Sequence, residues 1–145
     1  FGENGGILIE GELSASGTED NPVQIDGKEG WKGIHLLHTG DLQRSRMTFV
    51  NLSNASTGIH LKNGRLEARN LMIRECRTAI SADKNTFLRI VDSEFDSNHT
   101  AIKSDANDTI LKNITLIKND FMTEFGGVPK KQEEKKITDF SRFRY

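Results

Sequence analysis

The chain has 145 residues, and its 20 lysines and arginines almost balance its 21 aspartates and glutamates, giving a formal net charge of -1. This balance excludes a globally basic domain of the kind that binds nucleic acid, and no apolar run approaches the roughly 18 residues of a membrane-spanning helix. The single cysteine, Cys76, excludes an internal disulfide and a cysteine-rich metal site. The length suits one domain, and the opening at Phe1 instead of methionine indicates a fragment or a processed product.

Apolar and polar residues alternate with a period of two from the start of the chain. Ile7, Ile9, Leu13 and Ala15 fall on one parity, and the same alternation returns repeatedly before residue 121. A period of two predicts pleated strands with one buried face, and the clusters of Asn, Asp, Gly, Ser and Thr between them predict turns. No helical stripe of about 12 residues occurs before residue 128. We therefore expect an all-β fold.

A repeat organises these strands. Four segments contain a small residue followed by isoleucine, and their isoleucines are spaced by 25, 21 and 22 residues: Ile34, Ile59, Ile80 and Ile102. Three of them are preceded, seven residues earlier, by an apolar residue: Leu52, Ile73 and Phe95. One coil of this length cannot bury its apolar face, so the coils should stack and place the four isoleucines above one another, about 4.8 Å apart. The prediction is a parallel β-helix of about five coils.

The same register gives three smaller expectations. Asn98 should occupy a corner between strands, in the left-handed conformation, and ladder its side-chain amide to the next coil. A column of alternating charge, which favours ion pairs between coils, should contain Ser53, Arg74, Asp96 and Lys118. The apolar pairs that begin with Leu66 and Ala68, and with Leu88 and Ile90, should continue at Ile110 and Lys112.

Two other solenoids compete with this interpretation. A left-handed β-helix needs a hexapeptide period, which the sequence does not have. A leucine-rich repeat is closer, because residues 111–121 fit its consensus. The segments that follow Cys76 and Asn98 begin another strand-like Thr-Ala-Ile instead of a convex helix, which favours the β-helix.

Four stretches carry a more specific pattern: residues 5–18 (GGILIEGELSASGT), 21–25 (NPVQI), 30–34 (GWKGI) and 95–102 (FDSNHTAI). In these residues the chain resembles right-handed parallel β-helix proteins of the pectate-lyase-like superfamily, in the type found in bacterial secreted and surface proteins. The resemblance covers roughly residues 5–121. It implies a right-handed β-helix, a location outside the cell or on its surface, and a further coil ahead of the opening pattern.

The resulting division is a β-helix domain of residues 1–121, truncated at its amino terminus, and a tail of residues 122–145. Within the tail, residues 126–129 (GGVP) indicate a linker, and residues 130–136 form a run of mixed charge. An open solenoid end needs a cover, so the tail is either a linker or a cap that folds back onto the last coil.

The resemblance is weaker for activity than for fold. We expect a non-catalytic module that is structural, adhesive or polysaccharide-binding; the alternative is a fragment of a polysaccharide lyase or glycoside hydrolase. Such lyases hold Ca²⁺ with clustered acids, and related glycosidases pair carboxylates from neighbouring coils. The nearest catalytic candidates are Asp92, Glu94 and Asp96, although no predicted column stacks two carboxylates.

His35 and His60 follow equivalent isoleucines, so they should stack on one outer face, with Ser81 and Lys103 above them. Two neutral histidines about 5 Å apart could bind a metal ion or a proton, but the column supplies no good third ligand, and we expect no metal and no cofactor. Trp31 is either a platform for sugar stacking or a buried residue at the first corner. We expect any ligand to bind along an outer strand face near Trp31, His35 and His60.

The β-helix interpretation also predicts the kinds of partner. They are a polysaccharide or other surface domains, and the open end coils make end-to-end or edge self-association plausible. We expect neither nucleic-acid binding nor insertion into a membrane.

Overall fold

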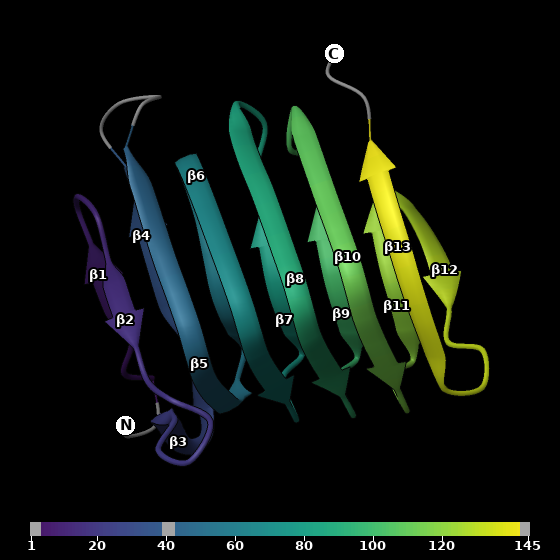
Figure 1. Ribbon diagram of the computed structural model, residues 1–145, viewed down its shortest axis with the longest axis horizontal. Coiled ribbons are helices and arrows are strands. Elements are labelled where there is room, and N and C mark those ends of the chain that lie inside the picture. Colours follow the sequence, from purple (N-terminus) through teal and green to yellow (C-terminus); the bar gives the residue numbers. More distant parts are fainter. Residues whose placement is uncertain (1–3, 39–42, 143–145) are drawn as a thin grey trace.

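The computed structural model describes residues 4–38 and 43–142, and in this part of the chain it contains strands and turns but no helix. The strands wind into a parallel β-solenoid of about four turns, somewhat fewer than the repeat predicted (Figure 1). No described segment forms a helix that is long and apolar enough to cross a membrane. The predicted all-β solenoid is therefore confirmed.

Two parallel sheets enclose the core. Sheet A consists of β1 (Ile7–Ile9), β4 (Ile34–Leu37), the first part of β6 (Thr57–Arg74), β7 (Thr78–Ala82), β9 (Thr100–Ser104) and β11 (Phe121–Phe125). Sheet B consists of β2 (Ser14–Ser16), β3 (Val23–Trp31), β5 (Arg44–Ala55), the second part of β6, β8 (Thr86–Asp96) and β10 (Asp108–Ile117). The long strand β6 belongs to both sheets because it continues from one face to the other.

The isoleucine column is the spine of the core. Ile34 pairs with Ile59, Ile59 with Ile80, and Ile80 with Ile102 in the parallel ladders of sheet A. Each of these side chains is at most 1% exposed. Both faces of the coils are strands, so the leucine-rich-repeat alternative, which needs a convex helix, is wrong.

The corner before sheet A combines a left-handed residue with a buried one. Positive φ angles occur at Asn54, Glu75, Ser97 and Lys118, and the residues that follow them are buried: Ala55, Cys76, Asn98 and Asn119. The left-handed conformation therefore belongs to Ser97, and the prediction that Asn98 would adopt it is wrong. The chain turns one residue earlier than predicted, and the Asn98 side chain is buried. The predicted amide ladder is confirmed, because Asn98 Nδ2 donates to Asn119 Oδ1 at 3.0 Å.

Two predicted columns are shifted by one residue after β9, for a single reason. Ser104 pairs with Ala82 and Thr109 with Leu88, so the connection into β10 is one residue shorter than the one into β8. Thr109 and Leu111, instead of Ile110 and Lys112, therefore continue the inward columns. For the same reason Ile117, instead of Lys118, follows Asp96.

The expected ion pair between Arg74 and Asp96 is also not formed. Arg74 Nη2 donates to Met72 Sδ at 2.7 Å, and Asp96 accepts a hydrogen bond from Ser97 Oγ at 2.7 Å. Arg74 and Asp96 are thus satisfied within their own coils, and Ser53 donates to Asp26 of the preceding coil at 2.9 Å.

The tail covers the last coil. β12 (Val128–Lys131) pairs antiparallel with β11, and β13 (Lys136–Arg142) pairs antiparallel with β10 (Figure 1, yellow end). The reversal of strand direction ends the parallel stack, and the whole of β12 is exposed. Charged and proline-containing edge strands resist further pairing. Residues 128–142, which lie against the last coil, are called the cap below, and the choice between a linker and a capping role stays a prediction.

Candidate ligand-binding surface

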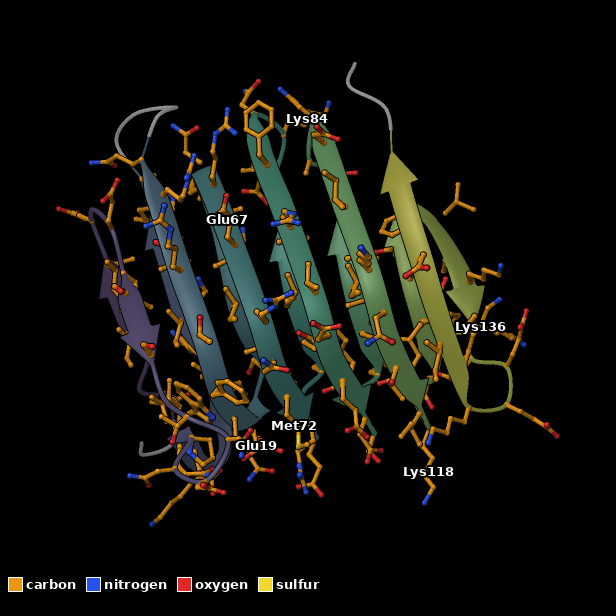
Figure 2. The ribbon with its side chains drawn as sticks, viewed as in Figure 1. Glu19, Glu67, Met72, Lys84, Lys118 and Lys136 are labelled. Atoms are coloured by element: carbon orange, nitrogen blue, oxygen red, sulfur yellow. The ribbon has the colours of Figure 1, made fainter. Side chains whose placement is uncertain are left out.

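Five arginines point outward from the first halves of three neighbouring strands as these run through sheet B. We call this surface the arginine face, and its arginines are Arg44 and Arg46 on β5, Arg65 and Arg69 on β6, and Arg89 on β8. They point outward because they alternate along their strands with buried residues such as Leu66 and Leu88. Arg44 lies beside Arg65, and Glu67 lies between Arg46 and Arg89 (Figure 2, label Glu67).

Acidic neighbours balance this charge only in part. Glu67 lies 3.6 Å from both Arg44 Nε and Arg46 Nε, and Asp92 Oδ2 lies 3.4 Å from Arg69 Nε. The side chains of Arg46 and Arg69 remain 64% and 63% exposed. Exposed ion pairs of this kind are weak, about 0–1 kcal/mol. The guanidinium groups therefore stay accessible to an external anion, which they can grip with two parallel hydrogen bonds.

The arginine face is hollowed along its length. A shallow depression of about 240 Å³ lies among Arg46, Glu67, Arg69 and Arg89. Arg89 also lines a smaller depression beside Phe87 and Arg65, and these two residues in turn line a hollow of about 820 Å³ at the end of the sheet. The first two depressions share Glu67 and Arg89, and the last two share Arg65 and Phe87, so they adjoin one another across the strands. We call these three adjoining depressions the track.

The far end of this track is also basic. Lys62 and Lys84 line the large hollow together with one acid, Glu10 (Figure 2, label Lys84). The guanidinium carbon of Arg65 lies 4.4 Å from the centre of the Phe87 ring, a cation–π contact that orients the arginine. The track thus offers cations at intervals and one aromatic surface.

The predicted catalytic acids all lie on β8, but two of them have structural partners. Asp92 accepts a hydrogen bond from Asn113 Nδ2 at 2.8 Å in addition to its contact with Arg69, and Asp96 accepts one from Ser97. Glu94 is half-buried on the same strand. A catalytic role for the three stays a prediction.

Asp26, on β3, has a shifted pKa. Hydrogen bonds from Asn54 Nδ2 and Ser53 Oγ, each at 2.9 Å, lower the pKa of its carboxyl below the ordinary value. A general acid needs the opposite shift, so Asp26 serves as a structural acceptor that ties two coils together.

Trp31 lies in the core. It is 0% exposed, and its indole Nε1 donates to the Ser53 carbonyl at 2.8 Å. Trp31 is therefore the buried corner residue of the two alternatives, and its ring is not accessible for stacking on a sugar. The tryptophan also packs closely over Gly27, where a Cβ atom would overlap the indole.

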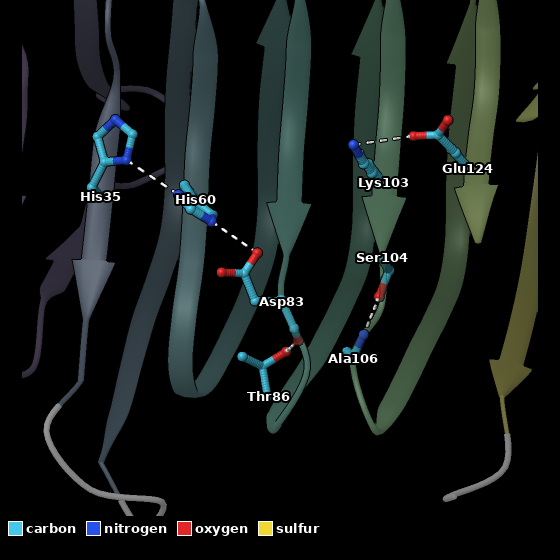
Figure 3. A network of polar contacts seen from close by, with 8 residues as sticks. All are labelled: His35, His60, Asp83, Thr86, Lys103, Ser104, Ala106 and Glu124. Atoms are coloured by element: carbon cyan, nitrogen blue, oxygen red, sulfur yellow. Dashed lines mark hydrogen bonds and ion pairs between the residues drawn. The ribbon is translucent and has the colours of Figure 1, made fainter. Parts of the chain in front are cut away.

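His35 and His60 are brought together as expected, and a residue that the sequence reading missed joins them. Their Nδ1 atoms lie 3.3 Å apart, and His60 Nε2 lies 2.9 Å from Asp83 Oδ1 (Figure 3). Asp83 comes from the turn after β7, one coil further along. Its contact with His60 could not be predicted from the repeat, because a repeat aligns strand residues with strand residues and not with turn residues. Ser81 and Lys103 follow in the same column, as predicted.

Comparison with known proteins assigns no relative. No family model matches the chain, and neither a curated protein nor a solved structure matches it. The geometry of the two outer faces is therefore the basis for a functional proposal.

The sequence reading also missed the arginine face, although a signal for it exists. Arg44 with Arg46, and Arg65 with Arg69, are separated by even numbers of residues in stretches of period two, so each pair shares one side of a strand. The polar columns predicted from the repeat pass through the histidines and through Ser53, Arg74, Asp96 and Lys118, and none of them contains the five arginines of this face.

Proposed function

We propose that this chain is a non-catalytic β-solenoid module of a secreted or cell-surface protein, and that it binds an acidic polysaccharide along the arginine face. The observation that carries the proposal is the cluster of five arginines on the arginine face, which in the described part of the chain form ion pairs with only two carboxylates, Glu67 and Asp92. The whole chain has a net charge of -1, so this positive cluster is local.

The spacing of the arginines suits a linear polymer with repeated anionic groups. Neighbouring strands lie about 4.8 Å apart, and residues two positions apart on a strand lie about 6.6 Å apart. Guanidinium groups match carboxylate and sulfate groups in shape and bind them with paired hydrogen bonds. A rigid sheet loses little conformational entropy when it binds, which favours a preformed surface of this kind.

A nucleic acid fits the same surface less well. Duplex DNA carries one phosphate charge per about 1.7 Å, and proteins meet it with a dense set of lysines and arginines. Glu67 and Asp92 lie within the arginine face and would repel closely spaced phosphates. A polysaccharide with one charge per sugar can place its anionic groups between these acids.

The finer family assignment is part of the proposal. We place the chain among right-handed parallel β-helices of the pectate-lyase-like superfamily, with its location outside the cell or on its surface. Connections between parallel strands of one sheet are right-handed in nearly all proteins, and the buried asparagine ladder suits stacked coils. Cell fractionation would test the location, since recovery of the protein in the cytosol would contradict it.

The experiment compares two double variants that remove the same charge. Arg46→Gln with Arg89→Gln alters the arginine face, and Lys130→Gln with Lys131→Gln removes two exposed lysines of the cap as a control. Binding to polygalacturonate, alginate and neutral dextran is measured at low and moderate salt. We expect binding to the two acidic polymers alone, weakened by salt, and at least about tenfold weaker in the arginine variant only.

Four outcomes would contradict the proposal. Equal loss in both double variants would reduce the interaction to net charge, and binding to dextran would remove the need for the arginines. Tighter binding of duplex DNA through the same arginines would identify a nucleic-acid surface. Release of reducing sugar or unsaturated uronate from the same incubations, lost in Asp96→Ala, would favour the enzyme alternative.

A further inference from the structure

The hydrogen bonds of His35 and His60 fix the positions of their ring protons. Asp83 Oδ1 lies 2.9 Å from His60 Nε2, and the carbonyl oxygen of Lys32 lies 3.2 Å from His35 Nε2. A carboxylate and a carbonyl can only accept hydrogen bonds, so each Nε2 must carry the proton. If both rings are neutral, each has a single N–H group and both Nδ1 atoms are without a proton. If one ring is protonated instead, its Nδ1–H group donates to the other Nδ1.

The two Nδ1 nitrogens face each other. Their distance is 3.3 Å, and the rings meet edge to face with an interplanar angle of 83°. Two lone pairs this close repel each other unless a positive charge lies between them. A metal ion at the usual bond length of about 2.0–2.1 Å would bind both nitrogens with an N–metal–N angle of about 107°, which is nearly tetrahedral.

We propose that His35 and His60 bind a divalent late transition metal ion through their Nδ1 atoms, with water molecules as the remaining ligands. Imidazole nitrogen suits Cu²⁺, Ni²⁺ and Zn²⁺. Asp83 and the Lys32 carbonyl are positioning groups, because they fix the tautomer of each ring and hold it in place. The ligands come from β4 and β6, so the ion would join two successive coils.

The surroundings of the pair allow this role. The His60 side chain is 27% exposed, so an ion can enter from solvent. Asp83 contributes negative charge beside the site, and Lys103, two positions further along the column, is neutralised by Glu124 at 3.5 Å (Figure 3). No third His, Cys, Asp or Glu in the described part of the chain completes the site, which leaves room for water.

The other two histidines serve as internal comparisons. Both ring nitrogens of His38 are occupied, by the Asn63 carbonyl and by Ser45 Oγ. His99 Nδ1 lies 2.8 Å from Asp120, so His99 has the same type of carboxylate partner as His60, and its ring neighbour is Phe121 instead of a second histidine. His99 is therefore a matched control for the paired site.

The test is a titration of the whole chain, after treatment with a chelator, with Cu²⁺, Ni²⁺ or Zn²⁺ as the sole probe. Calorimetry gives the stoichiometry and affinity, and the melting temperature is recorded with and without the ion. We expect one site per chain and a higher melting temperature with metal, since the ion binds only the folded arrangement. Cu²⁺ should show an electron paramagnetic resonance spectrum with two imidazole nitrogens.

The variants separate this site from chance binding. His35→Gln and His60→Gln should each lower the affinity at least about tenfold, Asp83→Ala should lower it about 10–100-fold, and His99→Gln should leave it unchanged. The melting temperatures of the metal-free variants show whether each one folds. Absence of saturable binding, or equal binding by wild type and His35→Gln, would overturn the proposal and leave a shared proton as the charge between the rings. The site lies on sheet A, so its failure would not affect the arginine face on sheet B.

Discussion

Oδ1 of Asn119 accepts hydrogen bonds from both the backbone N–H and the side-chain amide of Asn98, each at 3.0 Å. The pattern continues in both directions. Asn98 Oδ1 accepts from the Cys76 N–H at 3.0 Å, and Asn119 Nδ2 donates to Gln132 Oε1 in the cap at 2.9 Å. The buried corner column is thus a continuous chain of amide hydrogen bonds that ends at the tail.

Asn98→Ala should lower the free energy of unfolding by about 3 kcal/mol. The change leaves the Cys76 N–H and the Ile73 carbonyl without their partners in a corner where Asn98 is only 2% exposed. Urea denaturation measures the loss. Asn51→Ala, on the outer side of β5, should change stability by less than about 0.5 kcal/mol. Similar values for the two variants would mean that the ladder contributes little.

Gly33→Ala should be far more damaging than Gly127→Ala. Both glycines have positive φ angles, +87° and +79°, so an alanine costs about 1–2 kcal/mol at either position from backbone strain alone. A Cβ atom on Gly33 would also overlap the Thr57 carbonyl of the next coil, whereas one on Gly127 meets nothing within 4 Å.

We expect Gly33→Ala to lose at least about 3 kcal/mol or to fail to fold, and Gly127→Ala to lose about 1 kcal/mol. Melting temperatures and soluble yields of the two proteins, prepared side by side, provide the comparison. A Gly33→Ala protein as stable as Gly127→Ala would show that neighbouring coils can separate at this corner without cost.

Ile80→Ala should lower the free energy of unfolding by about 2–5 kcal/mol, because it opens a cavity in the middle of the spine. Ile80 is 0% exposed and lies between Ile59 and Ile102. Leu8→Ala is the control, since Leu8 is 62% exposed on the outer side of β1. A loss below about 1 kcal/mol at Ile80 would contradict tight stacking of the coils.

The isoleucine spine could be predicted from the sequence because its buried positions recur along the chain as apolar residues at similar intervals. Ile34, Ile59, Ile80 and Ile102 occupy one environment, and that environment accepts few residue types. Equivalent positions of the repeat therefore hold the same residue type, isoleucine, even though their spacing varies from 21 to 25 residues.

The one-residue errors have an equally physical origin. The turn into β10 is shortened by one residue, and its polar residues Asp105 and Asn107 resemble those of other turns, so the composition of the turn does not reveal its length. The contact between His60 and Asp83 is hidden for a related reason: it joins a strand residue to a turn residue of the next coil. Only coordinates reveal such a contact, because the two positions are not equivalent in the repeat.

Cys76 should be unreactive in the folded protein, and its titration should reduce stability at high pH. Burial raises the pKa of its thiol from the ordinary value of 9.0 to about 11. Between these two values the unfolded chain loses the proton first, so the stability due to this group is complete below pH 9.0 and is lost as the pH rises toward about 11.

The measurement uses iodoacetamide labelling and urea denaturation of wild type and Cys76→Ala. At pH 8 we expect slow labelling of wild type in buffer and fast labelling in urea, because only the exposed thiolate reacts. Between pH 9 and pH 11 wild type should lose about 2 kcal/mol more stability than Cys76→Ala. The comparison cancels the titration of lysines, which both proteins share. Fast labelling without urea, or parallel pH profiles, would show that the corner column opens readily and that Cys76 is not held in the dry core.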